Sequence, residues 1–202
     1  MLDFARTAAA IAGTSSTLEK RRLLAAYLRP LPEAELRRAA VFLTGQPYGR
    51  AERRTLNLGW ATVSRVVQAL SGRSPEELSG LYRRHGDLGD WAAAALAERP
   101  GEGDLALTEI TTELDAIGSA GTTAARDRLL TTLLSRLSAQ EVRYLVKVLT
   151  GELRIGLQEG LLEAALADAF EVPLEGVRRV HMVTGDIGET AVQAQRGDLE
   201  TA

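Results

Sequence analysis

The feature that most constrains the fold of this chain is an internal repeat. Residues 17–45 read TLEKRRLLAAYLRPLPEAELRRAAVFLTG, and residues 123–151 read TAARDRLLTTLLSRLSAQEVRYLVKVLTG. An arginine, a leucine pair and a final Leu-Thr-Gly recur in the same order at a constant offset of 106 residues. Each copy continues with a loop that contains glycine and arginine, an apolar segment, a shorter segment and a Gly-Asp-Leu/Ile-Gly sequence. Because self-similarity in this order indicates a duplication, the fold must be built from two related halves.

The spacing of apolar residues predicts that both halves are helical. Leucine and alanine recur three and four positions apart in 129–137 and in 161–169, which is the pattern of an amphipathic helix. Ser74 and Ser138 each precede a glutamate by three residues, as in a capping box, and glycines 45, 72 and 151 stand where helices are expected to end. We predict helices over 60–70, 75–84, 108–117, 161–170 and 173–183. The alternation typical of strands is lacking, so the predicted fold class is all-α.

The same comparison predicts the domain organisation. The first repeat spans about 15–98, a linker of Pro, Gly and charged residues spans 99–107, and the second repeat spans about 108–196. Because each copy must bury an apolar face, we expect one helical domain of 1–202 with two pseudo-twofold-related repeats. The loops that follow Gly45 and Gly151 would then emerge on comparable sides.

Composition excludes several kinds of site. Cysteine is absent, which excludes disulfide scaffolds, thiolate nucleophiles and Cys-ligated metals. His85 and His181 are far apart, and we interpret both as structural or solvent-facing, so no metal site is predicted. No apolar run approaches the ~20 residues that span a bilayer, and the first residues lack a signal-peptide pattern. We therefore expect a cytoplasmic protein with no membrane partner.

Charge is unevenly distributed along the chain. The net charge is −3, yet residues 1–100 hold 15 Lys and Arg against 10 Asp and Glu, while residues 101–202 hold 9 against 17. Lys20 and Lys147 are the only lysines, and the other 22 cations are arginines. Arginine suits phosphate recognition, but a GC-rich genome also favours arginine codons, so charge alone does not decide the partner.

Two loops are the candidates for chemistry. In 151–160, three glycines relax the backbone between two helices, so that bare N–H groups, the next helix's N-terminus and Arg154 can meet a phosphate. The loop 45–54 of the first copy is longer and more basic. The alternative is that the glycines only allow tight turns and the arginines are solvated. Two such loops at equivalent places match the two backbones of a duplex, which favours nucleic-acid binding.

Other conspicuous residues have structural interpretations. Asp87 and Asp186 are predicted to be N-caps of the helices that follow them. The aromatic residues on apolar stripes are predicted to be core: Tyr27, Phe42, Trp60, Trp91, Tyr144 and Phe170. No phosphate-loop, nucleophile-elbow or zinc-protease motif occurs, and no active site is visible.

The run Leu-Thr-Gly-Glu-Leu-Arg-Ile-Gly-Leu-Gln-Glu, which begins at residue 149, resembles a signature of a known family. The family comprises the N-terminal DNA-binding domains of ATP-dependent DNA ligases, in particular the bacterial B-type enzymes. Its Gly-x-Leu-Arg-x-Gly signature is matched here by Gly151, Leu153, Arg154 and Gly156. Similar segments are residues 117–121, 42–47 and 58–61, so the resemblance covers about residues 5–195.

The resemblance implies a pseudo-twofold helical domain that binds the minor groove and backbone of nicked double-stranded DNA. It also implies a ring around DNA formed with the ligase's own nucleotidyltransferase and OB-fold domains, for replication, repair or recombination in the bacterial nucleoid. Carried over by position, the DNA-binding residues are Gly151, Leu153, Arg154, Ile155, Gly156, Leu157 and Gln158 in the second copy. In the first copy the looser match gives Gly45, Arg50, Arg53 and Arg54.

The chain departs from the family at the catalytic step. Ligases attack ATP with the lysine of a Lys-x-Asp-Gly motif, and neither lysine of this chain is in such a motif. We therefore expect no adenylation by this chain alone, with ATP and Mg²⁺ used by the parent enzyme, whose nucleotidyltransferase domain is expected to begin near residue 202. Two alternatives stay open: a helical-repeat scaffold for protein partners, and a complete enzyme that would form a stable protein–AMP adduct.

Overall fold

The computed structural model describes residues 1–52, 54, 56, 58–99, 101, 103 and 105–199. Before the linker the helices are α1 (Leu2–Ala12), α2 (Thr17–Leu28), α3 (Glu33–Leu43), the short 3₁₀ helix η1 (Arg50–Glu52), α4 (Trp60–Ser71), α5 (Pro75–His85) and α6 (Leu88–Ala95). After it come α7 (Leu107–Ser119), α8 (Thr123–Ser135), α9 (Ala139–Thr150), α10 (Glu159–Phe170), α11 (Leu174–Thr184) and α12 (Ile187–Arg196). No strand occurs among the described residues, so the predicted all-α class is confirmed. The five predicted helices are found to within two residues at either end.

The helix ends follow the predicted capping chemistry. Ser74 and Ser138 both form complete capping boxes, at the starts of α5 and α9. Gly72 and Gly151 end α4 and α9 in the left-handed region, with φ of 63° and 71°. Gly45, at φ 77°, directly follows the C-cap of α3. Sequence-local signals therefore set most of the helix boundaries.

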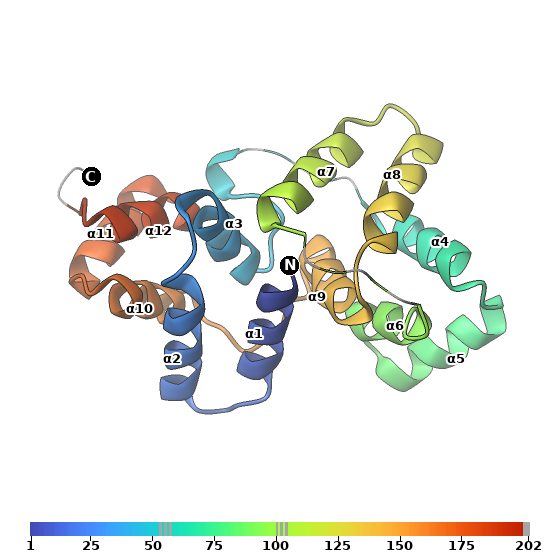
Figure 1. The fold of residues 1–202 in the computed structure, drawn as a ribbon, viewed down its shortest axis with the longest axis horizontal. Helices are drawn as coiled ribbons and strands as arrows, with labels where there is room; N and C mark the ends of the chain where they lie inside the picture. Colours follow the sequence, from blue (N-terminus) through green and yellow to red (C-terminus); the bar gives the residue numbers. More distant parts are fainter. Residues whose placement is uncertain are drawn as a thin grey trace. The chain divides into compact units, whose positions relative to one another are not determined.

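The chain folds into two compact units, and neither unit corresponds to one sequence copy. The first unit contains residues 1–5 and 55–153, and the second contains residues 6–54 and 154–202. In the first unit, α6 packs against α9 and α4 against α8. In the second, α12 packs against α3 and α10 against α2 (Figure 1). The compact units thus cut across the predicted repeat boundaries, and the pseudo-twofold relation of the repeats stays a prediction.

The two sets of helix pairs are equivalent under the duplication. In each copy the helix before the Leu-Thr-Gly packs against the last helix of the other copy, α3 on α12 and α9 on α6. Arg37 of α3 pairs with Glu189 of α12 at 2.7 Å, and Arg143 of α9 forms the corresponding ion pair with Asp90 of α6. The duplicated segments therefore exchange partners reciprocally.

The Gly-Asp-Leu/Ile-Gly sequences make these helix pairs possible. Asp87 and Asp186 are N-caps, as predicted, and accept hydrogen bonds from the backbone N–H of the third residue after each. A Cβ on Gly89 would overlap the carbonyl oxygen of Arg143, and one on Gly188 would lie 3.0 Å from side-chain atoms of α3. The aspartate therefore starts the helix, and the glycine lets it approach its partner closely.

The core consists mainly of leucine, valine and alanine, with a few aromatic residues. The prediction of burial is confirmed for Phe42, Trp91 and Tyr144. It is wrong for Trp60, which is 46% exposed although its ring lies 5.1 Å from that of Trp91 and 5.8 Å from that of Tyr82, centroid to centroid. Tyr27 and Phe170 are half-buried.

Part of the predicted linker packs on the first unit. The N–H of Gly103 donates to the carbonyl oxygen of Arg136 at 3.2 Å, and a Cβ on Gly101 would overlap the backbone of Leu137 and Ser138. Residues 100, 102 and 104 lie outside the described residues. None of the described helices is both long and apolar enough to cross a bilayer.

Candidate nucleic-acid interface

The second loop, defined as residues 151–158, alternates between buried and exposed side chains. Leu153 and Ile155 are each only 4% exposed, whereas Arg154 and Gln158 are exposed and Leu157 is half-buried. The two apolar anchors hold the backbone against the protein. The side chains of Leu153 and Ile155 are thus part of the core, and the DNA contact expected of these two residues stays a prediction.

The backbone of the second loop is held in an uncommon conformation. Arg154 has φ 25° and Gly156 has φ 65°, both on the positive side that L side chains rarely adopt. The side chain of Lys20, on α2, donates hydrogen bonds to the carbonyl oxygens of Ile155 at 3.0 Å and Gly156 at 2.8 Å. Sequence reasoning missed Lys20, although its rarity in an arginine-rich chain was a signal.

The first loop, defined as residues 45–52, is tied to its own unit at several points. Glu52 pairs with Arg38 of α3 at 2.6 Å and accepts the N–H of Gly49 at 3.1 Å. A Cβ on Gly49 would lie 2.5 Å from the Asp186 carboxylate, so this loop passes close to the start of α12. The result is a fixed turn that carries Arg50 on an exposed surface.

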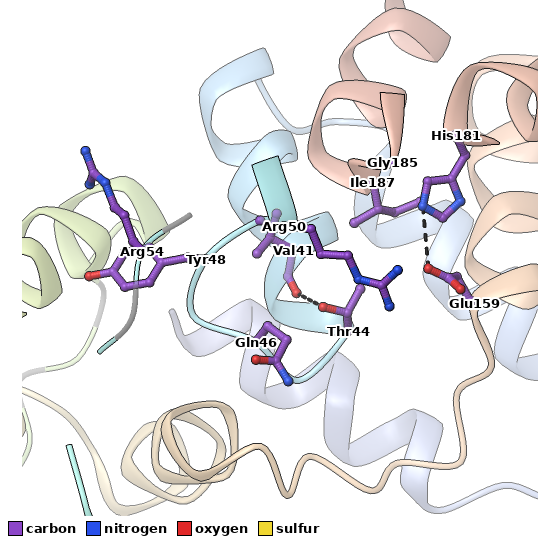
Figure 2. Close-up of a pocket in the computed structure, with 11 residues that line it drawn as sticks. Val41, Thr44, Gln46, Tyr48, Arg50, Arg54, Glu159, His181, Gly185 and Ile187 are labelled. Atoms are coloured by element: carbon purple, nitrogen blue, oxygen red, sulfur yellow. Dashed lines mark hydrogen bonds and ion pairs between the residues drawn. The ribbon is translucent and has the colours of Figure 1, made fainter. Parts of the chain in front are cut away.

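Arg54 follows the first loop, and its side chain points in a different direction from that of Arg50 (Figure 2). Its guanidinium lies 5.9 Å from the ring centroid of Tyr48, which is itself buried. Figure 2 shows the Arg54 side chain pointing away from the part of the pocket that Arg50 enters. Arg53 lies outside the described residues. Gly45 is buried, whereas Arg50 and Arg54 are both exposed and both line the same pocket.

The two loops meet in the second unit. A hollow of about 210 Å³ is lined by Arg50 of the first loop, Leu157 and Gln158 of the second loop, and residues of α3 and α10. Gly151 and Leu153 belong to the first unit and do not line it. The structure thus brings together three of the predicted DNA-binding residues from positions more than 100 apart in the sequence.

A larger pocket of about 360 Å³ adjoins the hollow and shares Thr44, Arg50 and Glu159 with it. Figure 2 shows the Arg50 guanidinium reaching toward the side of the pocket formed by Glu159 and His181. Gln46 adds an amide to the wall. The lining of the pocket therefore combines arginine, glutamine and glutamate side chains with apolar ones such as Val41 and Ile187.

His181 is held by two glutamates of α10. Its Nδ1 lies 2.7 Å from Glu163 and its Nε2 lies 3.5 Å from Glu159. The prediction that His181 is structural or solvent-facing is compatible with a side chain that is 12% exposed. The glutamate partners could not be read from the local sequence, since they come from another helix.

The charged groups near the two loops include two lysines with partners within the protein. Among the described residues no cluster of His, Asp and Glu is arranged to hold a metal ion. The Lys20 ammonium is engaged with carbonyl groups, and that of Lys147 lies 2.9 Å from the Asp87 carboxylate. Both lysines therefore have internal partners.

Comparison with known proteins gives the family. The family described as "DNA ligase N terminus" matches residues 1–167. A "Probable DNA ligase" of Koribacter versatilis is 45% identical over 201 residues, which cover 98% of this chain and 34% of that protein. A "Probable DNA ligase" of Opitutus terrae is 33% identical over 97% of this chain and 23% of its own length. The "DNA ligase" of Archaeoglobus fulgidus is 30% identical over 96% of this chain and 36% of its own length.

The matched part is thus between 23% and 36% of the length of these relatives. This chain belongs to the family of DNA ligase N-terminal domains.

Proposed function

We propose that this chain is the DNA-binding module of a DNA ligase and that it engages the backbone and minor groove of nicked duplex DNA through the first and second loops. The observation that carries the proposal is the hollow that Arg50 shares with Leu157 and Gln158. Arg154, exposed on the same second loop, supplies a second cation. Arginine guanidinium groups and backbone N–H groups are common partners of DNA phosphates.

The proposal includes the rest of the parent enzyme. The chain spans about a third or less of the length of these two relatives. In this proposal a parent ligase also carries nucleotidyltransferase and OB-fold domains and uses ATP and Mg²⁺. The module would hold the nicked duplex while that catalytic core seals it, in replication, repair or recombination. A cytoplasmic location, at the bacterial nucleoid, follows from this substrate.

Backbone contact predicts a specific salt dependence. Each phosphate that a cation neutralises steepens the slope of log K against log salt by roughly 0.9. Arg50→Ala and Arg154→Ala should each weaken binding to a nicked duplex and lower the slope by about that amount. Fluorescence anisotropy titrations at several salt concentrations measure both quantities.

The matched control is Arg22→Ala. Arg22 lies on α2 in the same unit, its side chain is 72% exposed, and it pairs with Glu19 of its own helix. Its removal changes the net charge by the same amount as the other two substitutions but should leave the slope unchanged. Equal effects of all three substitutions would mean that general charge, and not the two loops, determines binding.

The scaffold alternative predicts an apolar groove for a protein partner. Both pockets combine apolar side chains with the Arg50 guanidinium and a glutamine amide, so neither is the purely apolar groove that the scaffold alternative predicts. A partner captured equally well after nuclease treatment and at high salt would support the scaffold instead.

A further inference from the structure

The two lysines of this arginine-rich chain differ in how their charge is balanced. The side chain of Lys147 is 12% exposed and pairs with the carboxylates of Asp87 at 2.9 Å and Asp90 at 3.5 Å. Lys20 is 8% exposed, and no ion pair joins it to a carboxylate within the part of the chain that the structure describes. Its two hydrogen bonds go to neutral carbonyl groups of the second loop. A positive charge therefore stays directly beneath this loop.

These hydrogen bonds also orient the loop's peptide groups. In a trans peptide the C=O and the following N–H point in opposite directions, and the described residues contain no cis peptide. Because the carbonyl groups of Ile155 and Gly156 point toward Lys20, the N–H groups of Gly156 and Leu157 point away from it. Neither N–H donates to any described residue. Successive N–H groups around a left-handed residue form an anion-binding concavity.

Gly156 shows how closely the lysine fits under the loop. A Cβ at this position would lie 2.6 Å from the Lys20 Nζ, and φ is 65°. The backbone therefore wraps around the ammonium group, with no side chain between them. Arg154 is two residues before Gly156 on the same loop and is exposed.

We propose that Lys20 is a positioning residue for DNA binding. Its hydrogen bonds hold the second loop so that the outward N–H groups of the loop and Arg154 meet a phosphate. Its positive charge, which no carboxylate of the described residues neutralises, lies beneath these groups. This inference rests on the proposed function. In this arrangement Lys20 acts through the loop and not by direct contact with DNA, because it is 8% exposed and donates two hydrogen bonds to the loop's carbonyl groups.

The test compares three variants of the full chain. Lys20→Met removes the charge and the hydrogen bonds, while Lys20→Arg keeps the charge and offers donors. Arg29→Met is the matched control, because Arg29 follows the same helix and donates to the carbonyl oxygens of Ala169 and Asp168, away from the loop. Binding of nicked duplex is measured by anisotropy, and trypsin cleavage after Arg154 is followed by mass spectrometry.

Lys20→Met should weaken DNA binding roughly tenfold and accelerate cleavage after Arg154. Lys20→Arg should restore most of the affinity. Arg29→Met should bind DNA as the unsubstituted protein does. If Lys20→Met is folded and binds and is cleaved like the unsubstituted protein, the inference is overturned. If Lys20→Met does not fold, Lys20→Gln is compared with Arg29→Gln by the same two measurements. Failure of the unsubstituted chain to bind DNA contradicts the proposed function, whereas the cleavage measurement still decides whether Lys20 orders the loop.

Discussion

At the scale of single residues, Gly156 satisfies two requirements at once. Its φ of 65° lies where a side chain is strained, and the space that a Cβ would need is occupied by the Lys20 ammonium. Strain of this kind costs about 1–3 kcal/mol for a residue other than glycine. The conformation of the second loop thus depends on Gly156, which has no side chain, and on the buried charge of Lys20 beside it.

Gly156→Ala is therefore expected to lower the free energy of unfolding by about 1–3 kcal/mol. Gly160→Ala is the matched control, since Gly160 lies in the first turn of α10 and a Cβ there would only approach Glu163 at 3.9 Å. Alanine should stabilise a helix at such a site by roughly 0.5–1 kcal/mol. Urea denaturation measures both, and equal effects at the two positions would show that Gly156 is under no special constraint.

The residue scale also shows what a sequence can reveal about the candidate site. The signature identified the second loop, yet Leu153 and Ile155, which belong to it, proved to be buried. A motif marks which positions matter to a family without separating those that touch a ligand from those that fix the backbone. Lys20 and the Glu163–His181 pair were missed because their partners are distant in sequence.

At the scale of helices, the close approach of α6 to α9 depends on Gly89. A Cβ there would overlap the carbonyl oxygen of Arg143 and the Lys147 side chain, so backbone would have to move. At Gly188, the equivalent residue of α12, the corresponding atoms lie at 3.0 Å or more, which leaves slightly more room.

Gly89→Ala should consequently destabilise the protein by about 1–3 kcal/mol, and Gly188→Ala by less. Gly80→Ala serves as the control, because Gly80 lies inside α5 and a Cβ there would have nothing within 4 Å. It should raise stability by roughly 0.5–1 kcal/mol. Thermal unfolding of the three variants ranks them, and a stable Gly89→Ala protein would show that the helices are not held this closely.

The start of α6 also predicts a dependence on pH. Burial acts to raise the pKa of the Asp87 carboxyl, but hydrogen bonds from Lys147 and from the Asp90 backbone outweigh it, so the pKa lies below its ordinary value. The unfolded chain therefore takes up this proton more readily. The stability that Asp87 provides is complete above about pH 4 and is lost as the pH falls through the folded-state pKa.

Asp87→Asn keeps a capping group but removes the charge that pairs with Lys147. The variant should be less stable than the unsubstituted protein at pH 7, and the difference should shrink at pH 3. Urea denaturation at the two pH values measures it. A difference that stays constant would mean that the Asp87 charge does not contribute.

At the scale of the whole molecule, the duplication and the compact units divide the chain differently. The repeat and its helices were predictable because capping and periodicity are local signals. The exchange of partners was not, since α3 with α12 and α9 with α6 are pairings across the copies. The apolar face of a helix indicates that another helix must pack against it, but it does not indicate which copy supplies that helix.

Reciprocal pairing predicts how the halves behave when separated. Residues 1–99 and 105–202, produced as two polypeptides, should each lack stable tertiary structure and should fold together when mixed, because each compact unit needs helices from both. Circular dichroism and size-exclusion chromatography of the separate and mixed halves test this. Halves that fold independently would contradict the reciprocal assignment.

The first loop and residues 154–158 of the second loop, all in the second unit, are the proposed DNA-binding surface, and every functional prediction above depends on them. Hydrogen exchange measured by mass spectrometry, with and without a nicked duplex, reports directly which backbone segments DNA covers. Slower exchange is expected in residues 45–52 and 154–158 when DNA is bound. Unchanged exchange in both segments, with DNA bound and protection elsewhere, would contradict this assignment of the surface.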